Sequence, residues 1–200
     1  MALFTADAAD PIQTAIDQYR QISGYQVTIK SVGKGKTEII NYYFKKPGHV
    51  RMKFVAPFKG AELVYDPRSR QARLWPFGYG SFPSLNLSPD SRLIRSSTGQ
   101  RVDRSDVGAL YRNVRALQGH GTIETLGIET FHGAEALHVA VSANDGFSLD
   151  GVSRYQLWLD GESGFPLRVM SYAMDGALME TVEMEELRID PRFPEDFFRQ

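Results

Sequence analysis

The 200-residue chain contains no cysteine, and this absence removes three kinds of chemistry. Disulfide bridges, thiol catalysis and zinc–thiolate sites all require cysteine. The sequence also lacks an apolar run of about 20 residues, the length that a helix needs to cross a bilayer. Its charges nearly cancel, with 23 Lys and Arg against 24 Asp and Glu, so there is no broad positive field for nucleic acid. A nucleic-acid-binding function is therefore not expected.

The start of the chain lacks the features of a secretion signal. Residues 1–7, MALFTAD, contain neither a basic segment nor a full apolar core. A secreted domain that carries an added start methionine would have the same appearance, so secretion stays open at this point. Residues 1–9 are accordingly expected to be disordered or to come from cloning.

The sequence does have the apolar patterning of a folded domain. Hydrophobic residues make up 42% of the chain and aromatic residues 12%, which argues against disorder. Asp10 and Pro11 form a helix start, with Gln13 as the expected capping-box partner, and apolar residues then recur at helical spacing. Ser105 is the expected cap of a second segment with the same spacing. We predict amphipathic helices over residues 11–23 and 106–118.

Most of the remaining chain alternates apolar and polar residues with a period of two, which predicts β-strands. Short turns such as Lys46-Pro47-Gly48 and Asp175-Gly176 separate the strands. Residues 76–103 are rich in Gly, Pro and Ser without a sustained period and predict a long loop. Because no strand–helix–strand alternation occurs, the pattern favours a mixed α+β fold with a large curved antiparallel sheet. We predict one domain over residues 1–200, in which an unclosed half-barrel of about ten strands carries two or more helices on its concave face.

Catalytic and cofactor motifs find little support in the sequence. The segment 33–37, GKGKT, ends like a phosphate-binding loop, but the glycine required five positions before Gly35 is Lys30. The segment also joins two strands, so it lacks the helix N-terminus that binds phosphate. The four histidines do not have metal-ligand spacing. We therefore expect no enzyme, no catalytic residue, no cofactor and no metal.

An excess of large apolar side chains on the predicted sheet is the main functional signal. In the strand over residues 37–45, Ile40, Tyr42 and Phe44 share one face, while Ile39 and Tyr43 lie on the other. One face is expected to meet the helices, and the other a lid, a partner or part of a cavity lining. Two interpretations stay open: an ordinary core with scattered exposed aromatics, or an apolar ligand cavity beneath the helices.

Several short motifs carry a family resemblance. They are the segments 44–52 (FKKPGHVRM) and 61–66 (AELVYD), and in the C-terminal half 158–160 (WLD), 164–167 (GFPL) and Asp175-Gly176. In order and spacing the chain resembles the LolA/LolB-type periplasmic lipoprotein carriers over roughly residues 10–190. The resemblance implies an unclosed β-barrel with a helical lid, located in the periplasm after removal of a signal peptide. It implies binding of lipoprotein acyl chains or phospholipid without catalysis or cofactor, with transient membrane contact, an inner-membrane release complex and an outer-membrane receptor as partners.

The resemblance, together with the strand alternation, selects the candidate site residues. Lys46 matches a position where these carriers have an inward-facing arginine, and lysine cannot form the same forked hydrogen bonds. The other candidates for lid closure lie on the apolar faces of the two helices: Ile16, Tyr19, Leu110 and Val114. The candidates for the ligand cavity are Tyr25, Val27, Ile29, Ile40, Tyr42, Phe44, Val50, Met52, Phe54, Leu63 and Tyr65.

Two functions therefore stand side by side. The first is a non-catalytic carrier that takes acyl chains into the cavity for transport toward the outer membrane, with residues 76–103 controlling access or docking a partner. The alternative is an envelope-stress sensor or protein-interaction module of the same fold, without transported cargo.

Overall fold

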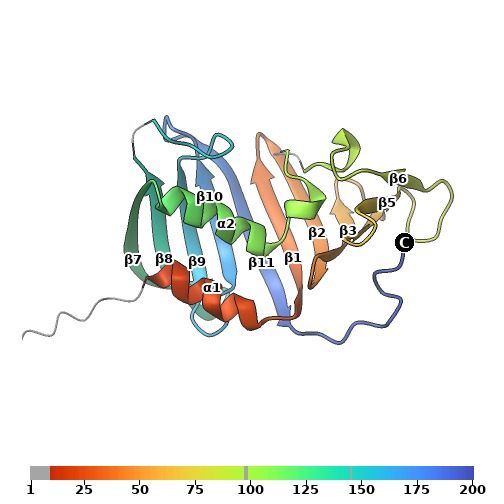
Figure 1. Ribbon diagram of the computed structural model, residues 1–200, viewed down its shortest axis with the longest axis horizontal. Helices are drawn as coiled ribbons and strands as arrows, with labels where there is room; N and C mark the ends of the chain where they lie inside the picture. The colour runs from red at the N-terminus through yellow and green to blue at the C-terminus, as the bar shows by residue number, and fades with distance from the viewer. Residues whose placement is uncertain (1–9, 97–98, 145) are drawn as a thin grey trace, which may run out of the picture.

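A computed structural model describes residues 10–96, 99–144 and 146–200, and the expectation for residues 1–9 lies outside this range. Eleven antiparallel strands form one curved sheet, and two α-helices lie across its concave face (Figure 1). The edge strands β6 and β7 do not pair with each other, so the barrel is unclosed and the predicted fold class is confirmed. The strands are β1 (Gly24–Gly33), β2 (Lys36–Lys45), β3 (His49–Ala56), β4 (Glu62–Asp66), β5 (Gln71–Trp75), β6 (Leu85–Leu87), β7 (Gly121–Phe131), β8 (Ala134–Ala143), β9 (Arg154–Asp160), β10 (Pro166–Tyr172) and β11 (Leu178–Ile189).

The sheet consists of two meanders that meet at the first and last strands. The strand order is β6-β5-β4-β3-β2-β1-β11-β10-β9-β8-β7, so β1 and β11 pair although they lie at opposite ends of the chain. Asp190 reinforces this seam, because its carboxylate accepts the backbone N–H groups of Ser23 and Gly24 at 2.7 and 2.9 Å. The helix α2 lies between the meanders in sequence and runs across the second meander, with its contacts on β7 and β8 (Figure 1).

Both helices begin with a side-chain cap. In α1 (Pro11–Gln21), Asp10 accepts the N–H groups of Ile12 and Gln13, as predicted, although the Gln13 side chain bonds to Asp17 and does not complete a capping box. In α2 (Val107–Gln118) the cap is Asp106, not the predicted Ser105. The Ser105 hydroxyl instead donates to the carbonyl of Val102 at 2.7 Å. The two helices are thus one or two residues shorter than the predicted ranges.

The segment over residues 76–103 contains more structure than the predicted loop. It holds the short edge strand β6, which pairs with β5, and two 3₁₀ turns, η1 (Arg92–Ile94) and η2 (Val102–Arg104). A three-residue strand between serines and prolines is too short to show an alternating pattern. No helix among the described residues has the length and apolar character needed to span a membrane.

The core lies between the helices and the concave face of the sheet. Tyr25 is only 1% exposed and contacts the rings of Tyr19, Phe44 and Phe165. On α2, Tyr111 is buried and donates its hydroxyl hydrogen to the carbonyl of Gly164 in the β9–β10 turn. The sheet end that carries these residues is therefore fully packed.

The C-terminal segment covers Tyr43, one of the two apolar residues on the outer face of β2. Residues 190–200 leave β11 and run toward β5 (Figure 1). Phe193 and Phe197 pack against the ring of Tyr43 on the outer face, with ring centroids 6.3 and 5.0 Å from it. The outer apolar side chain therefore contacts the protein's own C-terminal segment.

Candidate ligand-binding cavity

A cavity of about 1320 Å³ opens between the concave face of the sheet and the segment from η1 to α2. Its volume exceeds the roughly 300–1,000 Å³ of sites for drug-sized ligands. Strands β1, β2 and β3 of the first meander and β10 and β11 of the second contribute side chains to its floor. The cavity thus occupies the part of the concave face that the two helices do not fill.

The floor is mainly apolar because the alternation of these strands directs aliphatic and aromatic residues inward. Ile29 on β1 pairs with Ile40 on β2 and with Met184 on β11, so three apolar side chains form one row across the seam. Phe54 on β3 pairs with Ile40 and extends this row toward the opening. The remaining apolar floor residues include Met52, Leu74, Val152, Tyr155, Val169, Met179 and Val182.

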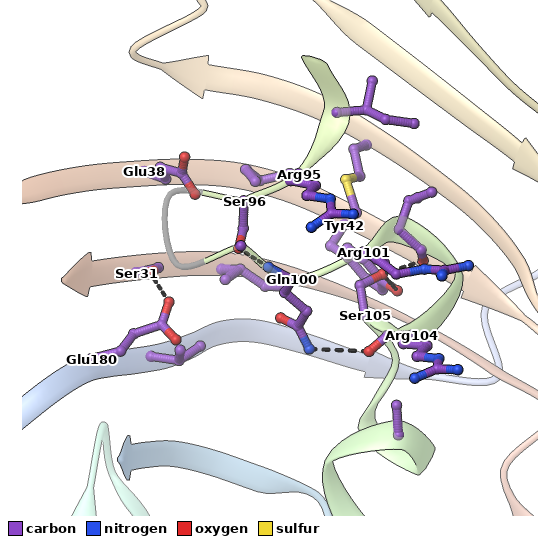
Figure 2. Close-up of a pocket in the computed structure, with 18 of the residues that line it drawn as sticks. Ser31, Glu38, Tyr42, Arg95, Ser96, Gln100, Arg101, Arg104, Ser105 and Glu180 are labelled. Carbon is purple, nitrogen blue, oxygen red and sulfur yellow. Dashed lines mark hydrogen bonds between the residues drawn. The ribbon is translucent and has the colours of Figure 1, made fainter. Parts of the chain in front are cut away.

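One side of the cavity is polar and is built largely by the chain before α2 (Figure 2). The Gln100 backbone N–H donates to the Ser96 hydroxyl at 2.9 Å, and its side-chain amide donates to the Arg104 carbonyl at 3.0 Å. The Arg101 guanidinium donates to Asp103 at 2.7 and 2.9 Å. These hydrogen bonds hold the segment before α2 in place, so that it forms one wall of the cavity.

Across the cavity, the polar groups belong to the sheet. Ser31 on β1 donates to the Glu180 carboxylate on β11 at 2.5 Å (Figure 2). The hydroxyls of Tyr42 and Ser105 lie 2.9 Å apart and join the floor to the segment before α2. The arrangement is therefore amphipathic, with an apolar floor and a polar wall that contains three arginines, Arg95, Arg101 and Arg104.

The tyrosines at the cavity remain neutral phenols at neutral pH. Burial raises the pKa of Tyr42 well above its usual range, and the hydrogen bond with Ser105 offsets this only in part. Burial likewise raises the pKa of Tyr155 to about 12, against the opposing effect of a hydrogen bond with Asn113. Their rings therefore contribute uncharged surface, which suits an apolar ligand.

The structure divides the predicted ligand residues into two groups along the strands. Six of them are at most 6% exposed and do not line the cavity: Tyr25, Val27, Phe44, Val50, Leu63 and Tyr65. One cross-strand row from β1 to β4 is formed by Tyr25, Phe44, Val50 and Tyr65. The five that line the cavity are Ile29, Ile40, Tyr42, Met52 and Phe54.

The predicted closure residues are also separated by the structure. Leu110 on α2 lines the cavity, whereas Val114, one turn further along, is fully buried against the sheet. On α1, Tyr19 is buried and Ile16 packs against the core. Lys46 donates its ammonium hydrogen to the Arg20 carbonyl at 2.7 Å, so it caps the C-terminal end of α1.

Two sets of lining residues do not appear among the sequence predictions. The first comes from the second meander, where Val169, Val182 and Met184 show the same alternation as the first meander and could have been found by it. The second is the polar wall from Arg95 to Arg104, which no periodic signal marks. Its position depends on the long-range contacts of the segment before α2.

One potential metal-binding group lies away from the cavity. Among the described residues, His132, Glu183 and Glu185 place one possible ligand atom each within 4.8 Å of one another. Glu183 already has a cationic neighbour, because Arg168 lies 3.7 Å from it, and within the group the His132 ring lies 3.6 Å from Glu185. The geometry is that of a salt-bridged outer surface of the sheet.

The unclosed antiparallel sheet and the two helices on its concave face define a LolA-like half-barrel. The profile of the MucB/RseB N-terminal domain matches residues 87–200, more than half of the chain. The chain belongs to the MucB/RseB N-terminal domain family. No curated protein sequence matches the chain.

Three solved structures show the same fold at low sequence identity. The complex of Pseudomonas aeruginosa MucA and MucB matches with a TM-score of 0.54 and 18% identity, over 98% of this chain and 61% of the other. The Mycobacterium tuberculosis lipoprotein LppX matches with a TM-score of 0.56 and 11% identity, over 92% and 95%. An uncharacterized conserved protein from Thermus thermophilus matches with a TM-score of 0.54 and 13% identity, over 94% and 96%. The chain therefore spans less than two thirds of the MucB chain that it matches.

Proposed function

We propose that this domain binds the acyl chains of a lipid or lipoprotein in the cavity, in the periplasm and without catalysis. The observation that carries the proposal is the volume of about 1320 Å³ lined by an apolar floor and bordered on one side by a polar wall. Each CH₂ group that leaves water contributes about 0.8 kcal/mol, so a long acyl chain can bind firmly through contact with this floor alone. The polar wall suits a headgroup, which would remain near solvent.

The use of the bound lipid distinguishes two candidate functions. As a carrier, the domain would take acyl chains from one membrane and deliver them toward the outer membrane. As a sensor, it would change its contact with a partner protein when lipid binds. The family match, and the structure of MucB in complex with MucA, favour the second use.

The binding proposal is tested by Met52→Glu, which would place a carboxylate on the apolar floor. Met52 lines the cavity, whereas Val55 on the same strand is 42% exposed and does not line it. Val55→Glu is therefore the matched control. We expect Met52→Glu to weaken binding of a fluorescent fatty acid at least tenfold, because the charge must be desolvated against an apolar ligand. The control should bind like the wild type.

Circular dichroism and native mass spectrometry complete this experiment. Both variants should keep the wild-type spectrum, and the wild type should retain added acyl lipid in the mass spectrum. Equal affinity of Met52→Glu and Val55→Glu for the fatty acid would contradict the cavity as the binding site. If the cavity is the binding site, a second measurement separates the two uses. Transfer of labelled lipid from the loaded protein to acceptor vesicles would support the carrier function, and absence of transfer would support the sensor function.

A further inference from the structure

The most exposed aromatic side chains gather at one end of the sheet. Phe58, Phe77 and Phe82 are 65, 75 and 94% exposed, and Leu93 on η1 is 71% exposed. Because the strands are antiparallel, the β3–β4 and β5–β6 connections that carry the phenylalanines lie at the same end of the sheet. All of these residues except Phe82 also line the cavity.

The two connections form one continuous surface. A Cβ atom at Gly78, in the β5–β6 connection, would lie 3.6 Å from the carbonyl oxygen of Gly60 in the β3–β4 connection, which is ordinary contact distance. The ring of Phe58 packs against Phe54 on the cavity floor, with centroids 6.4 Å apart. The apolar cavity and the exposed rings are therefore connected through the opening.

Charge is concentrated on the same segment. The two connections and the segment before α2, residues 57–61 and 76–104, contain five Lys and Arg against two Asp and Glu, although the whole chain has a net charge of −1. Lys59 follows Phe58, and Arg92 precedes Leu93. Acidic residues at the opening, such as Glu38 and Glu180, belong to β2 and β11. The phenylalanine side of the opening is thus the cationic side.

We propose that this surface, made by Phe58, Phe77, Phe82, Leu93, Lys59 and Arg92, docks onto a bilayer that contains anionic lipids. Exposed aromatic rings insert into the interface between headgroups and acyl chains, and neighbouring cations are attracted to anionic headgroups. Such docking would place the opening of the cavity against the lipid. Only the passage of acyl chains into the cavity rests on the proposed function, since membrane binding itself is a separate property.

The test is co-sedimentation of the full chain with vesicles of phosphatidylcholine alone or mixed with phosphatidylglycerol. We expect sedimentation with the mixed vesicles that falls as salt is raised, because the ionic part of the attraction is screened. Phe82→Glu should reduce partitioning at least tenfold. It should leave fatty-acid binding in solution unchanged, since Phe82 does not line the cavity. Arg92→Glu should reduce partitioning onto the mixed vesicles several-fold.

The matched controls introduce the same kinds of substitution on other parts of the protein surface. Ile128 on β7 is 70% exposed, and Arg188 on β11 is exposed, so Ile128→Glu and Arg188→Glu repeat each change away from the proposed surface. Wild-type partitioning of both controls, with losses in Phe82→Glu and Arg92→Glu, supports the proposal. Failure of the wild type to bind mixed vesicles, or equal losses in the controls, overturns it. If fatty-acid binding persists in that case, the docking surface is wrong and the cavity function stands.

Discussion

At the scale of single residues, Asp10 connects the beginning of one helix to the end of the other. Its carboxylate caps α1 and also accepts hydrogen bonds from Arg115 and Gln118 in the last turn of α2. Partial burial raises the pKa of Asp10, but these side-chain bonds, with those from the backbone, outweigh burial and hold it below its usual 3.8. The ionised form therefore stabilises the fold.

We expect Asp10→Ala to lower the free energy of unfolding by about 1–2 kcal/mol, since loss of an N-cap alone costs about 1 kcal/mol. A lowered pKa makes the ionic part of this effect present above about pH 4 and lost as the pH falls through the folded-state pKa. Urea unfolding at neutral and acid pH measures both. Asp17→Ala is the control, because Asp17 is exposed and its partners Gln13 and Arg20 belong to α1. A difference between the two variants that stays constant down to pH 2 would contradict the ionic contribution.

On β1, the alternation in the sequence indicates which face a residue is on but not what covers it along the strand. Alternation places Tyr25, Val27 and Ile29 on one face, and the structure agrees. Tyr25 lies beneath the helices and Ile29 at the cavity, because the helices cover only one end of the strands. A period of two contains no information on where a helix from elsewhere in the chain will pack. Phe44 lies in the same packed region as Tyr25 and is 4% exposed. A substitution such as Phe44→Glu would therefore lower the stability of the fold and would not report on ligand binding alone.

At the scale of elements, α1 packs onto the β9–β10 turn without room for a side chain. A Cβ atom at Gly164 would lie 2.7 Å from the Ala15 carbonyl oxygen and 2.7 Å from the Gln18 side chain, and its φ is +63°. Gly161 in the same turn has no atom within 4 Å of such a position. The turn therefore offers a pair of glycines that differ in their contact with the helix.

We expect Gly164→Ala to lower the free energy of unfolding by about 2–4 kcal/mol. Backbone strain at positive φ contributes about 1 kcal/mol, and overpacking against α1 adds about 1–3 kcal/mol. Gly161→Ala should stay within about 0.5 kcal/mol of the wild type. Guanidinium unfolding compares the two, and equal stability of both variants would show that α1 does not depend on this close approach.

The elements themselves were largely predictable, and the exceptions have local causes. The amphipathic period and the Asp10-Pro11 start fix α1 within two residues, because both signals lie within the helix. The cap of α2 was misassigned because Ser105 and Asp106 are both good caps, and the long-range bond of Ser105 to Tyr42 decides between them. The strand β6 is defined by its pairing with β5, and its three residues are too few to show an alternating pattern in the sequence.

At the scale of the whole molecule, the cavity depends on elements that are distant in sequence. Its floor crosses the seam between β1 and β11, and its wall comes from the segment before α2. The resemblance to the lipoprotein carriers gave the shape of the fold, and the family match confirms its class. The polar wall was not predictable, because it arises from tertiary contacts between segments without a periodic pattern.

The outer face is also closed by a long-range contact, which centres on Arg51. Its guanidinium donates to Glu62 at 2.6 Å and to the Phe197 carbonyl at 2.8 Å, and it lies over the Phe197 ring with 4.7 Å to the centroid. Arg51 is only 8% exposed, so its removal would leave the negative charge of the Glu62 carboxylate without its nearest cation. The C-terminal segment contacts β3 through this group and the aromatic rings beside it, and Gln200 at its end donates hydrogen bonds to the carbonyls of Val64 and Gln71.

We expect Arg51→Ala to lower the free energy of unfolding by about 3 kcal/mol, because breaking a largely buried ion pair strands the remaining charge. It should also release the C-terminal segment, so that limited proteolysis cuts within residues 190–200 before the rest of the chain. Lys53→Ala on the same strand is the control, since Lys53 is more exposed and its ammonium lies 4.0 Å from Glu62. If both variants are cut at the wild-type rate, Arg51 is not needed to hold the segment, and its aromatic contacts and the hydrogen bonds from Gln200 to the Val64 and Gln71 carbonyls suffice. The cavity lies on the opposite face of β3, so fatty-acid binding should survive in Arg51→Ala at temperatures where the domain remains folded.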